Sequence, residues 1–367
     1  MLSSILQVED SKAFDVALLR LLHGSVGRMA TDYGEYHLEV TLVSKRFHKG
    51  AGCRFTRRGV GPTGGVANAV ETEQILKVYK NPPGLKDKKK AMNCIEEASV
   101  VVTRGSVPIY WQQKIMPQCG CLPMRMPPIE VSAGEEDCSL ACQEHLQELT
   151  TSYSACTVLD LLRQGQGDME SELSSRFKAS MGRIPETTAT SEEKPMKPRY
   201  VSWDFHAKCG HFGFDRVQEL ITELKEDISF FGYFSKEKVL TQKGIFRVNC
   251  ADSLDRTNVV QAALCETSLN DQLRGCKVFG DNMGGSIDGS ATLKSMFREL
   301  WADHGDVTAL QYAGTGALKS DYTRTGVRTY GGACDDLYKA IDRAYQDNYV
   351  NPQKQIVVDD ILRAGNR

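Results

Sequence analysis

The stretch GIFRVNCADSLDRTNVVQAALC, residues 244–265, decides the fold of the region around it. GIFRVN (244–249) has the short apolar run of a buried strand, and the apolar residues of VVQAALCETSL (259–269) recur at helical spacing. The intervening CADSLDRT is therefore predicted to be a loop that joins a strand to the N-terminus of a helix. Backbone N–H groups converge in such a loop, which makes it a binding site for an anion such as phosphate.

The side chains of this loop suit a cysteine-based phosphatase. The positive end of the helix favours the thiolate of Cys250, which would attack phosphorus and form a phosphocysteine. Arg256 would bind two phosphate oxygens through its planar fork and stabilise the transition state. Asp255, next to the arginine, is the first candidate for the proton donor, and Asp252 is the second. Thr257 could donate a hydrogen bond to the sulfur when it leaves in the hydrolytic step.

The cysteine-x5-arginine spacing alone is weak support for this chemistry. Cys119 and Arg125 repeat the spacing in CGCLPMR, but that copy contains Pro123 and has neither a strand pattern before it nor a helical pattern after it. The structural alternative for the main loop is a small buried thiol at Cys250, with Arg256 paired to a neighbouring aspartate. The strand and helix patterns on either side favour the catalytic interpretation.

The composition of the 367 residues limits the class of protein. With 41% hydrophobic and 25% charged residues the chain can bury a full core, and its formal net charge of −2 gives no reason to expect a nucleic acid partner. Glu9 and Asp10 interrupt the apolar core that a secretory signal would need. No run reaches the ~20 apolar residues of a membrane span. We therefore expect a cytoplasmic protein without a signal peptide or a transmembrane segment.

Twelve cysteines are scattered along the chain, and we expect them to be reduced thiols. The pairs Cys119/Cys121 and Cys138/Cys142 could be zinc ligands, but they lack CxxC spacing and a suitably placed histidine pair. We expect ordinary free cysteines, no metal and no other cofactor.

Hydrophobic patterns divide the chain into elements. Residues 12–25 have the spacing of a helix, so residues 1–30 are predicted to be an N-terminal helical extension and residues 31–367 a catalytic domain. Residues 36–47 alternate apolar and polar side chains, and residues 51–60 follow within hairpin range, which predicts two antiparallel strands. The expected fold is an α/β domain with a mixed central sheet flanked by helices and a cysteine-phosphatase-like loop between a strand and a helix.

Three further segments carry predictions of their own. Residues 164–198 contain few large hydrophobic side chains, which predicts a mobile insertion in the domain. NPPGLKDKKK (81–90) carries four lysines and is either a solvated hairpin tip or a contact for anionic lipid headgroups. The spacing of apolar residues predicts one helix from about 214 to 231.

The segment RVNCADSLDRTNVVQ resembles the signature R-x-N-C-x-D-C-L-D-R-T-N of the SAC phosphoinositide phosphatases. VETEQI (70–75), TRGSVPIYW (103–111), DFH (204–206) and QYAGTGALKSDYTRTG (311–326) are similar to further segments of that catalytic domain, in the same order. The resemblance extends over roughly residues 36–365. The two aspartates also have the same offsets as in the loop of the myotubularin lipid phosphatases, where the acid next to the arginine is the favoured proton donor.

The resemblance implies hydrolysis of a phosphate monoester on the inositol ring of a membrane phosphoinositide, without a metal. Phosphatidylinositol 4-phosphate is the first candidate substrate, with some activity on the 3-phosphate. A 5-phosphatase of phosphatidylinositol 3,5-bisphosphate is the nearest alternative. A protein tyrosine phosphatase shares the cysteine-x5-arginine loop but usually has small glycines within it, whereas ADSLD places two acids there.

The resemblance also implies which residues contact the substrate. Within the loop the candidates are Ala251, Ser253, Leu254 and Asn258, the last of which is expected to support the loop rather than the chemistry. Outside the loop the candidates are Lys319, Arg324, Asp204 and His206. The alternatives are a solvated loop around the first two of these and a core histidine for the last. Arg57, Arg58 and Arg104 could extend a basic rim around the pocket.

Three departures from the family pattern set further expectations. Ser253 stands where the signature has its second cysteine, and we expect activity to survive this change. Family members carry a further N-terminal subdomain, whereas this chain begins close to the catalytic part. The chain ends at DDILRAGNR, before any membrane anchor, so an anionic membrane surface or an unknown recruiting protein would bring it to endomembranes as a peripheral protein. The alternative outside enzymology is a catalytically weak scaffold that binds phosphoinositides.

Overall fold

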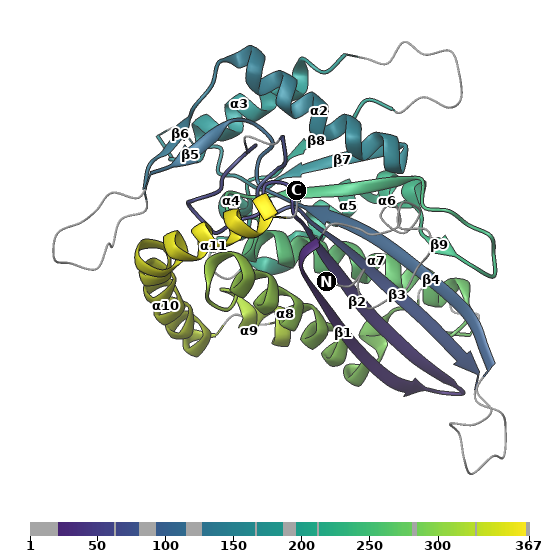
Figure 1. Cartoon of the computed structure of the whole chain (residues 1–367). Helices are drawn as coiled ribbons and strands as arrows, with labels where there is room; N and C mark the ends of the chain where they lie inside the picture. Colours follow the sequence, from purple (N-terminus) through teal and green to yellow (C-terminus); the bar gives the residue numbers. More distant parts are fainter. Residues whose placement is uncertain are drawn as a thin grey trace, which may run out of the picture.

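A computed structural model gives the fold of most of the chain. It describes residues 21–61, 64–80, 93–114, 127–165, 167–185, 196–210, 213–280, 285–326 and 329–364. One mixed sheet lies at the centre and helices cover it, as the sequence predicted (Figure 1). The lysine-rich stretch at 81–90 and the cysteines at 119 and 121 lie outside these residues.

The central sheet has an antiparallel half and a parallel half. The antiparallel half runs β1 (Leu21–Tyr33), β2 (Tyr36–Phe47), β3 (Val70–Lys80) and β4 (Asn93–Arg104). The parallel half continues from β4 through β10 (Gly244–Asn249) and β7 (Ala155–Asp160) to β8 (Arg199–Ser202). The short β9 (Phe234–Ser235) also pairs with β4, and β5 (Trp111–Gln113) with β6 (Ile129–Val131) forms a separate hairpin.

Every residue of β10 is buried because helices cover both faces of the parallel half. Ile245 packs in a cluster with α2 (Glu135–Tyr153) and α3 (Ser171–Gly182). Phe246 and Val248 point to the opposite face, where they pack with α5 (Val217–Glu223), α6 (Lys225–Phe231) and α7 (Asp255–Gly275). Because side chains alternate along a strand, both faces of β10 are buried, and its polar residues Arg247 and Asn249 are buried as well.

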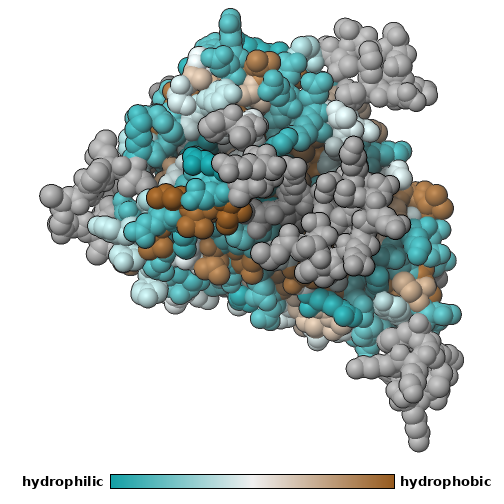
Figure 2. All heavy atoms as spheres, in the orientation of Figure 1, coloured by the Kyte–Doolittle hydropathy of each residue, from teal (hydrophilic) through white to brown (hydrophobic). Residues whose placement is uncertain are grey.

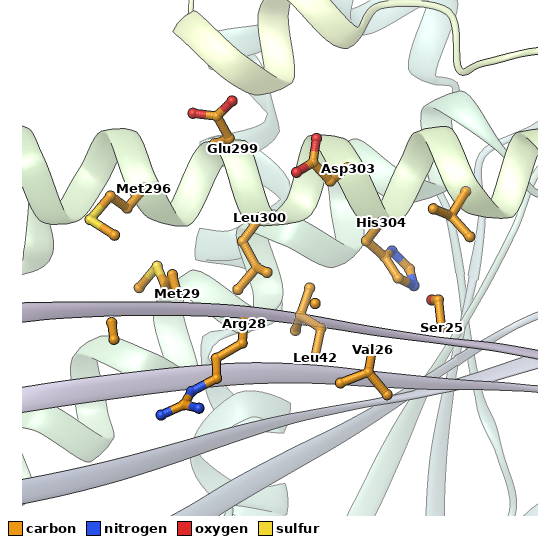
Figure 3. A pocket seen from close by; sticks show the side chains of 13 residues that line it. Ser25, Val26, Arg28, Met29, Leu42, Met296, Glu299, Leu300, Asp303 and His304 are labelled. Atoms are coloured by element: carbon orange, nitrogen blue, oxygen red, sulfur yellow. The ribbon is translucent and has the colours of Figure 1, made fainter.

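Helix α8 (Ala291–Ala313) covers the antiparallel half at β1 and β2, as Figure 3 shows. Leu300 points from the helix toward Met29 and Leu42 on the strands. A Cβ at Gly27 would lie 2.9 Å from Leu300 Cδ1, so a larger residue there would make the leucine side chain shift. Beside this contact lies a groove into which His304 points from α8.

The C-terminal helices lie next to the end of α8. They are α9 (Ser320–Thr325), α10 (Tyr330–Tyr345) and α11 (Asn351–Ala364), with a π-helical turn at Gln346–Val350. Figure 2 shows apolar surface gathered over this part of the molecule. The exposed apolar side chains of these helices include Leu337, Tyr338, Ile341, Tyr345, Tyr349, Ile356, Val357 and Ile361. None of the helices within the described ranges is long and apolar enough to cross a membrane.

The prediction of an N-terminal helix over residues 12–25 is wrong at its C-terminal end. Residues 21–25 belong to β1, which pairs with β2 along its whole length through a tight turn at Gly34 (φ 60°). The expected boundary between residues 30 and 31 therefore falls inside a strand of the central sheet. The part of the expected helix before residue 21 lies outside the described residues.

The predicted strand at residues 51–60 is also wrong, because that segment forms turns and β2 pairs with β1 and β3 instead. The segment turns inward to bury Arg54 and Arg58 beside the loop after β10. The predicted mobile insertion at 164–198 contains α3, whose Leu173 and Phe177 are fully buried. The single helix expected at 214–231 is divided at Leu224, where the backbone leaves the helical conformation (φ −90°, ψ 4°).

Candidate active site

The loop after β10 lies at the edge of the sheet where parallel strands end. Val248 pairs with Arg104 of β4, and Asn249 pairs with Asp160 of β7, so the next residues of all three strands meet there. The loop occupies residues 250–254, and α7 begins at Asp255. Ligands of open α/β sheets bind at this carboxyl edge. The predicted strand, loop and helix are therefore present in the structure.

The loop is held rigidly at its centre. Ser253 has a left-handed backbone (φ 52°), is fully buried, and donates a hydrogen bond from Oγ to the carbonyl oxygen of Gly105. Leu254 is buried among Ala309, Tyr312 and Ala313. The conformation of the loop is thus fixed by contacts on both sides, with only its polar groups left to face a ligand.

Cys250 and Arg256 line one cavity of about 210 Å³. The residues around this cavity are Arg54, His206, Cys250, Asp252, Asp255, Arg256, Leu318, Lys319, Ala340 and Arg343. Cys250 is 2% exposed as a residue, and Thr257 Oγ1 donates a hydrogen bond to its Sγ at 3.5 Å. The structure therefore brings the candidate nucleophile, the candidate phosphate ligand and both candidate acids to one place.

The guanidinium of Arg256 is bound by a residue that the sequence analysis missed. Glu170 accepts hydrogen bonds from Arg256 Nη1 at 2.8 Å and Nη2 at 2.6 Å, and the carbonyl oxygen of Leu161 accepts a third at 3.2 Å. Burial alone would lower the pKa of Arg256, but Cys250 and Glu170 raise it above its ordinary value. Arg256 is therefore a permanent cation in the first turn of α7.

Asp252 is held as a carboxylate between two buried arginines. Its oxygens lie 3.0 Å from Arg54 Nη2 and 2.6 Å from Arg58 Nη2. Burial by itself would raise the pKa of Asp252, but Arg54 and Arg58 outweigh it and hold that pKa well below the usual range. Arg54 also pairs with Asp347 at 2.7 Å, which ties the loop to the C-terminal helices.

Asp255 has a different set of partners at the first position of α7. Its Oδ1 accepts a hydrogen bond from the Leu318 N–H at 2.6 Å, and its Oδ2 accepts one from Arg343 Nη1 at 3.1 Å. Arg343 in turn donates to the Thr315 hydroxyl and the Gly316 carbonyl, so it is fixed on the far wall of the cavity. The carboxyl of Asp255 lies on the cavity and has Arg343 as its ion-pair partner.

Two of the four candidates outside the loop reach the cavity. His206 lies at its rim, and burial, Arg256 and Arg163 lower the pKa of this histidine to about 4, so the ring is neutral at pH 7. Lys319 also lines the cavity, with its backbone N–H bound to Asp336. Both residues therefore lie on the same cavity as Cys250 and Arg256.

The other two candidates have structural partners. Asp204 caps α4 (Phe205–Cys209) by accepting the Ala207 N–H at 2.8 Å, and it also accepts the Gln164 N–H. Arg324 pairs with three acids of α8, Glu299, Asp303 and Asp306, and is not among the residues that line the cavity. Arg324 therefore stabilises α9 against α8 rather than facing the cavity.

The expected basic rim of Arg57, Arg58 and Arg104 is not formed. Arg58 is buried against Asp252, and Arg57 pairs with Asp359 on α11. Arg104 is fully buried and donates to Asn258 Oδ1 at 3.0 Å, and burial lowers the pKa of Arg104 to about 10.

Asn258 and Ala251 support the loop from behind. The Asn258 amide donates to the carbonyl of Trp301 at 2.8 Å, and the carbonyl of Ala251 accepts from Arg58 at 3.0 Å. Both residues are buried, so the Asn258 side chain and the Ala251 backbone anchor the loop and α7.

The thiols of Cys138 and Cys142 do not form a metal site. Both side chains are buried on α2, and Cys142 Sγ lies 3.8 Å from Met181 Sδ. Burial raises the pKa of Cys142 to about 12. Among the residues that the structure describes, no three or more His, Cys, Asp or Glu side chains are grouped so as to hold a metal ion.

Sequence reasoning missed three charged residues of the site: Glu170, Arg54 and Arg343. Arg54 and Arg343 lie about 200 and 90 residues from the loop in the chain, and neither belongs to a local pattern that points to the loop. Glu170 lies in the polar segment that was predicted to be a mobile insertion. The one available signal was RFTRR (54–58), of which only Arg57 and Arg58 were considered, as part of a rim.

Known proteins resemble this chain over most of its length. A family model described as the SacI homology domain matches residues 1–210. Phosphoinositide phosphatase SAC6 of Arabidopsis thaliana is 34% identical over 359 residues, which are 97% of this chain and 55% of the relative. Phosphatidylinositol-3-phosphatase SAC1-B of Danio rerio is 33% identical over 346 residues, which are 93% of this chain and 53% of the relative. The chain therefore spans about half the length of the curated relatives that it matches.

Proposed function

The chain belongs to the SacI homology domain family, and from this premise we propose that it hydrolyses a phosphate monoester on the inositol ring of a phosphoinositide. The observation that carries the proposal is that Cys250 and Arg256 line one cavity at the carboxyl edge of the parallel strands. Arg54, Lys319 and Arg343 line the same cavity, which suits a phosphorylated ring. The names of the relatives support the same class of substrate.

In the proposed reaction the Cys250 thiolate attacks phosphorus and the P–O bond to the inositol breaks, which leaves a phosphocysteine. Arg256 and the backbone N–H groups of Ala251, Ser253 and Leu254 hold the phosphoryl oxygens. A proton passes to the departing alkoxide. Water then attacks phosphorus and gives up a proton, the S–P bond breaks, and inorganic phosphate leaves. Thr257, hydrogen-bonded to Sγ, stabilises the returning thiolate.

Asp255 is the proton donor in this proposal. Asp252 lies between two arginines that hold its pKa well below the usual range, so it carries no proton to give at neutral pH. Asp255 lies on the same cavity with one arginine, Arg343, at 3.1 Å. In the second step the carboxylate of Asp255 takes the proton from the attacking water, which returns the enzyme to its starting state.

The proposed substrate is phosphatidylinositol 4-phosphate, with some activity on the 3-phosphate. Lys319 and neutral His206 lie at the cavity and would contact the inositol ring or its other phosphates. The SAC1 relatives are named phosphatidylinositol-3-phosphatases, which supports activity on a monophosphate. Hydrolysis of the 5-phosphate of phosphatidylinositol 3,5-bisphosphate is the alternative to be compared in the same assay.

The proposed place of the reaction is the cytoplasmic surface of an endomembrane, where the enzyme binds peripherally. Phosphoinositides stay in the bilayer through their acyl chains, so the cavity has to reach a headgroup at the membrane surface. An anionic surface would attract the cations around the cavity. Sedimentation with vesicles that contain phosphatidylinositol 4-phosphate, compared with vesicles of phosphatidylcholine alone, tests this part of the proposal.

Phosphate release from a panel of short-chain phosphoinositides tests the function itself. Wild-type protein, Cys250→Ser and Cys334→Ser are compared with chelator present, the last being a control at an exposed cysteine on α10. The proposal expects release by the wild type and by Cys334→Ser, and none by Cys250→Ser. If folded wild-type protein releases phosphate from no lipid, the enzymatic proposal is wrong and a phosphoinositide-binding scaffold takes its place.

A further inference from the structure

The ion pair between Glu170 and Arg256 uses only one edge of the arginine. Glu170 Oε2 accepts from Nη1 and Oε1 accepts from Nη2, so the carboxylate meets the outer end of the guanidinium fork. The carbonyl of Leu161 takes the second Nη1 hydrogen. Of the five N–H donors of an arginine, three are therefore used.

The other two donors of Arg256 point along a second edge of the same group. They are Nε–H and the remaining N–H of Nη2, and among the described residues neither has a hydrogen-bond partner. Because Arg256 lines the cavity with Cys250, this inner edge is the part of the fork that can meet an oxyanion there. Two parallel N–H donors match two oxygens of a phosphoryl group.

Glu170 is itself fixed, so it can hold the arginine in one orientation. Its Oε2 accepts the backbone N–H of Arg163 at 3.0 Å, and its own N–H donates to Asp168 Oδ1 at 3.0 Å. Asp168 pairs with the Arg163 side chain at 2.9 Å. Burial would raise the pKa of Glu170, but Arg256 outweighs it and lowers that pKa below the usual range. The carboxylate is therefore ionised and held by backbone and side-chain contacts.

We propose that Glu170 is a positioning residue for the phosphatase reaction, which holds the outer edge of Arg256 so that the inner edge faces the phosphoryl group on Cys250. The inference rests on the proposed function and assigns a role to a residue of the segment before α3. Glu170 should stabilise the transition state more than the bound substrate, because the Arg256 guanidinium must match phosphoryl oxygens that spread into a plane during transfer. The negative charge of Glu170 also offsets one positive charge of the cavity, so its removal does not weaken attraction of a ground-state phosphate.

The first experiment compares Glu170→Gln with wild type in two kinds of measurement. On the preferred short-chain phosphoinositide, kcat should fall about 10- to 100-fold, the range expected for a misplaced group, while KM changes less than about twofold. Orthovanadate, which adopts the geometry of the transition state, should bind weaker by the same factor as kcat. Inorganic phosphate should bind to Glu170→Gln as tightly as it binds to the wild type. A loss of folded structure would instead lower kcat and weaken the binding of substrate, vanadate and phosphate together.

Two further variants make the result specific. Glu172→Gln removes the same charge from an exposed side chain two residues away and should leave kcat unchanged. In an Arg256→Lys background, where the fork is absent, adding Glu170→Gln should change kcat by less than about twofold, because Glu170 acts through the fork. If Glu170→Gln unfolds, Glu170→Asp keeps the charge on a shorter side chain and should show the same pattern with a smaller loss.

The outcomes separate this inference from the proposed function. The inference would be overturned if a folded Glu170→Gln variant kept the kcat and the vanadate affinity of the wild type. It would also be overturned if the loss of kcat caused by Glu170→Gln were just as large in the Arg256→Lys background. Both results leave the phosphatase activity standing. If the wild type releases phosphate from no lipid but binds vanadate, and Glu170→Gln weakens that binding selectively over phosphate, the proposed function fails and the role of Glu170 stands.

Discussion

Replacement of Asp252 by asparagine should lower the free energy of unfolding by about 3 kcal/mol, the lower end of the cost of breaking a buried ion pair. Two arginines lose their charged partner in this variant, Arg54 at 3.0 Å and Arg58 at 2.6 Å. The loss stays at the lower end because Arg54 keeps Asp347 and Arg58 keeps the carbonyl of Ala251. The asparagine oxygen can also still accept one hydrogen bond.

Urea denaturation of wild type and Asp252→Asn, followed by tryptophan fluorescence, measures this loss. Asp215→Asn, at an exposed side chain, is the matched control and should stay within about 0.5 kcal/mol of the wild type. The folded pKa of Asp252 is depressed, so its contribution is present above the unfolded pKa of about 3.9 and is lost only as the pH falls through the folded value. The difference in unfolding free energy between wild type and Asp252→Asn should therefore be constant between pH 5 and pH 8. A loss below about 1 kcal/mol would refute the view that the pairs with Arg54 and Arg58 hold the loop.

Three other perturbations have defined outcomes. Asp255→Asn should lower kcat on phosphoinositides about 100-fold. On an aryl phosphate with a good leaving group, which needs no proton, kcat should fall less than tenfold. Equal losses of kcat on the two substrates would argue against proton donation by Asp255. His304 is buried between Thr72 and Asn258, and burial lowers its pKa, so this residue should account for about 2 kcal/mol of the stability lost between pH 7 and pH 5, a share that should be missing from His304→Gln. Urea titrations at both pH values test this, and an unchanged difference in His304→Gln would contradict it. Ser253→Cys, which restores the residue of the family signature, should keep activity and change stability by less than about 1.5 kcal/mol, measured by the same titration.

Local patterns in the sequence predicted the strand, loop and helix that carry Cys250, because each of these elements is set by residues close together in the chain. An apolar run, a polar turn and helical spacing follow one another within 244–265. The positions of Cys250 and Arg256 on one cavity, and of Thr257 beside the Cys250 sulfur, follow from that arrangement. The mixed character of the sheet was also predictable from alternating and continuous apolar runs.

The ionic partners of the loop were not predictable, since they come from distant parts of the chain. Arg54 and Arg343 reach the two aspartates only after the sheet and the C-terminal helices have packed. The position of residues 51–60 within hairpin range of 36–47 suggested a strand, but there the burial of arginine side chains outweighs strand pairing. The polar composition at 164–198 suggested mobility, although Leu173 and Phe177 are enough to dock α3 and bring Glu170 to the site.

The order of strands in the sheet has a consequence for how the protein folds. The strand β10 is the last one along the described chain, yet it lies between β4 and β7, about 140 and 85 residues earlier. During synthesis both of those strands are made while their shared neighbour is still absent, and their backbone N–H and C=O groups stay unpaired on that side. Parallel pairing over such long separations is slow, so the edges remain open to other chains until β10 is inserted. The yield of folded protein should therefore rise when translation is slowed by low temperature, and the Cys250 loop should be among the last parts to form.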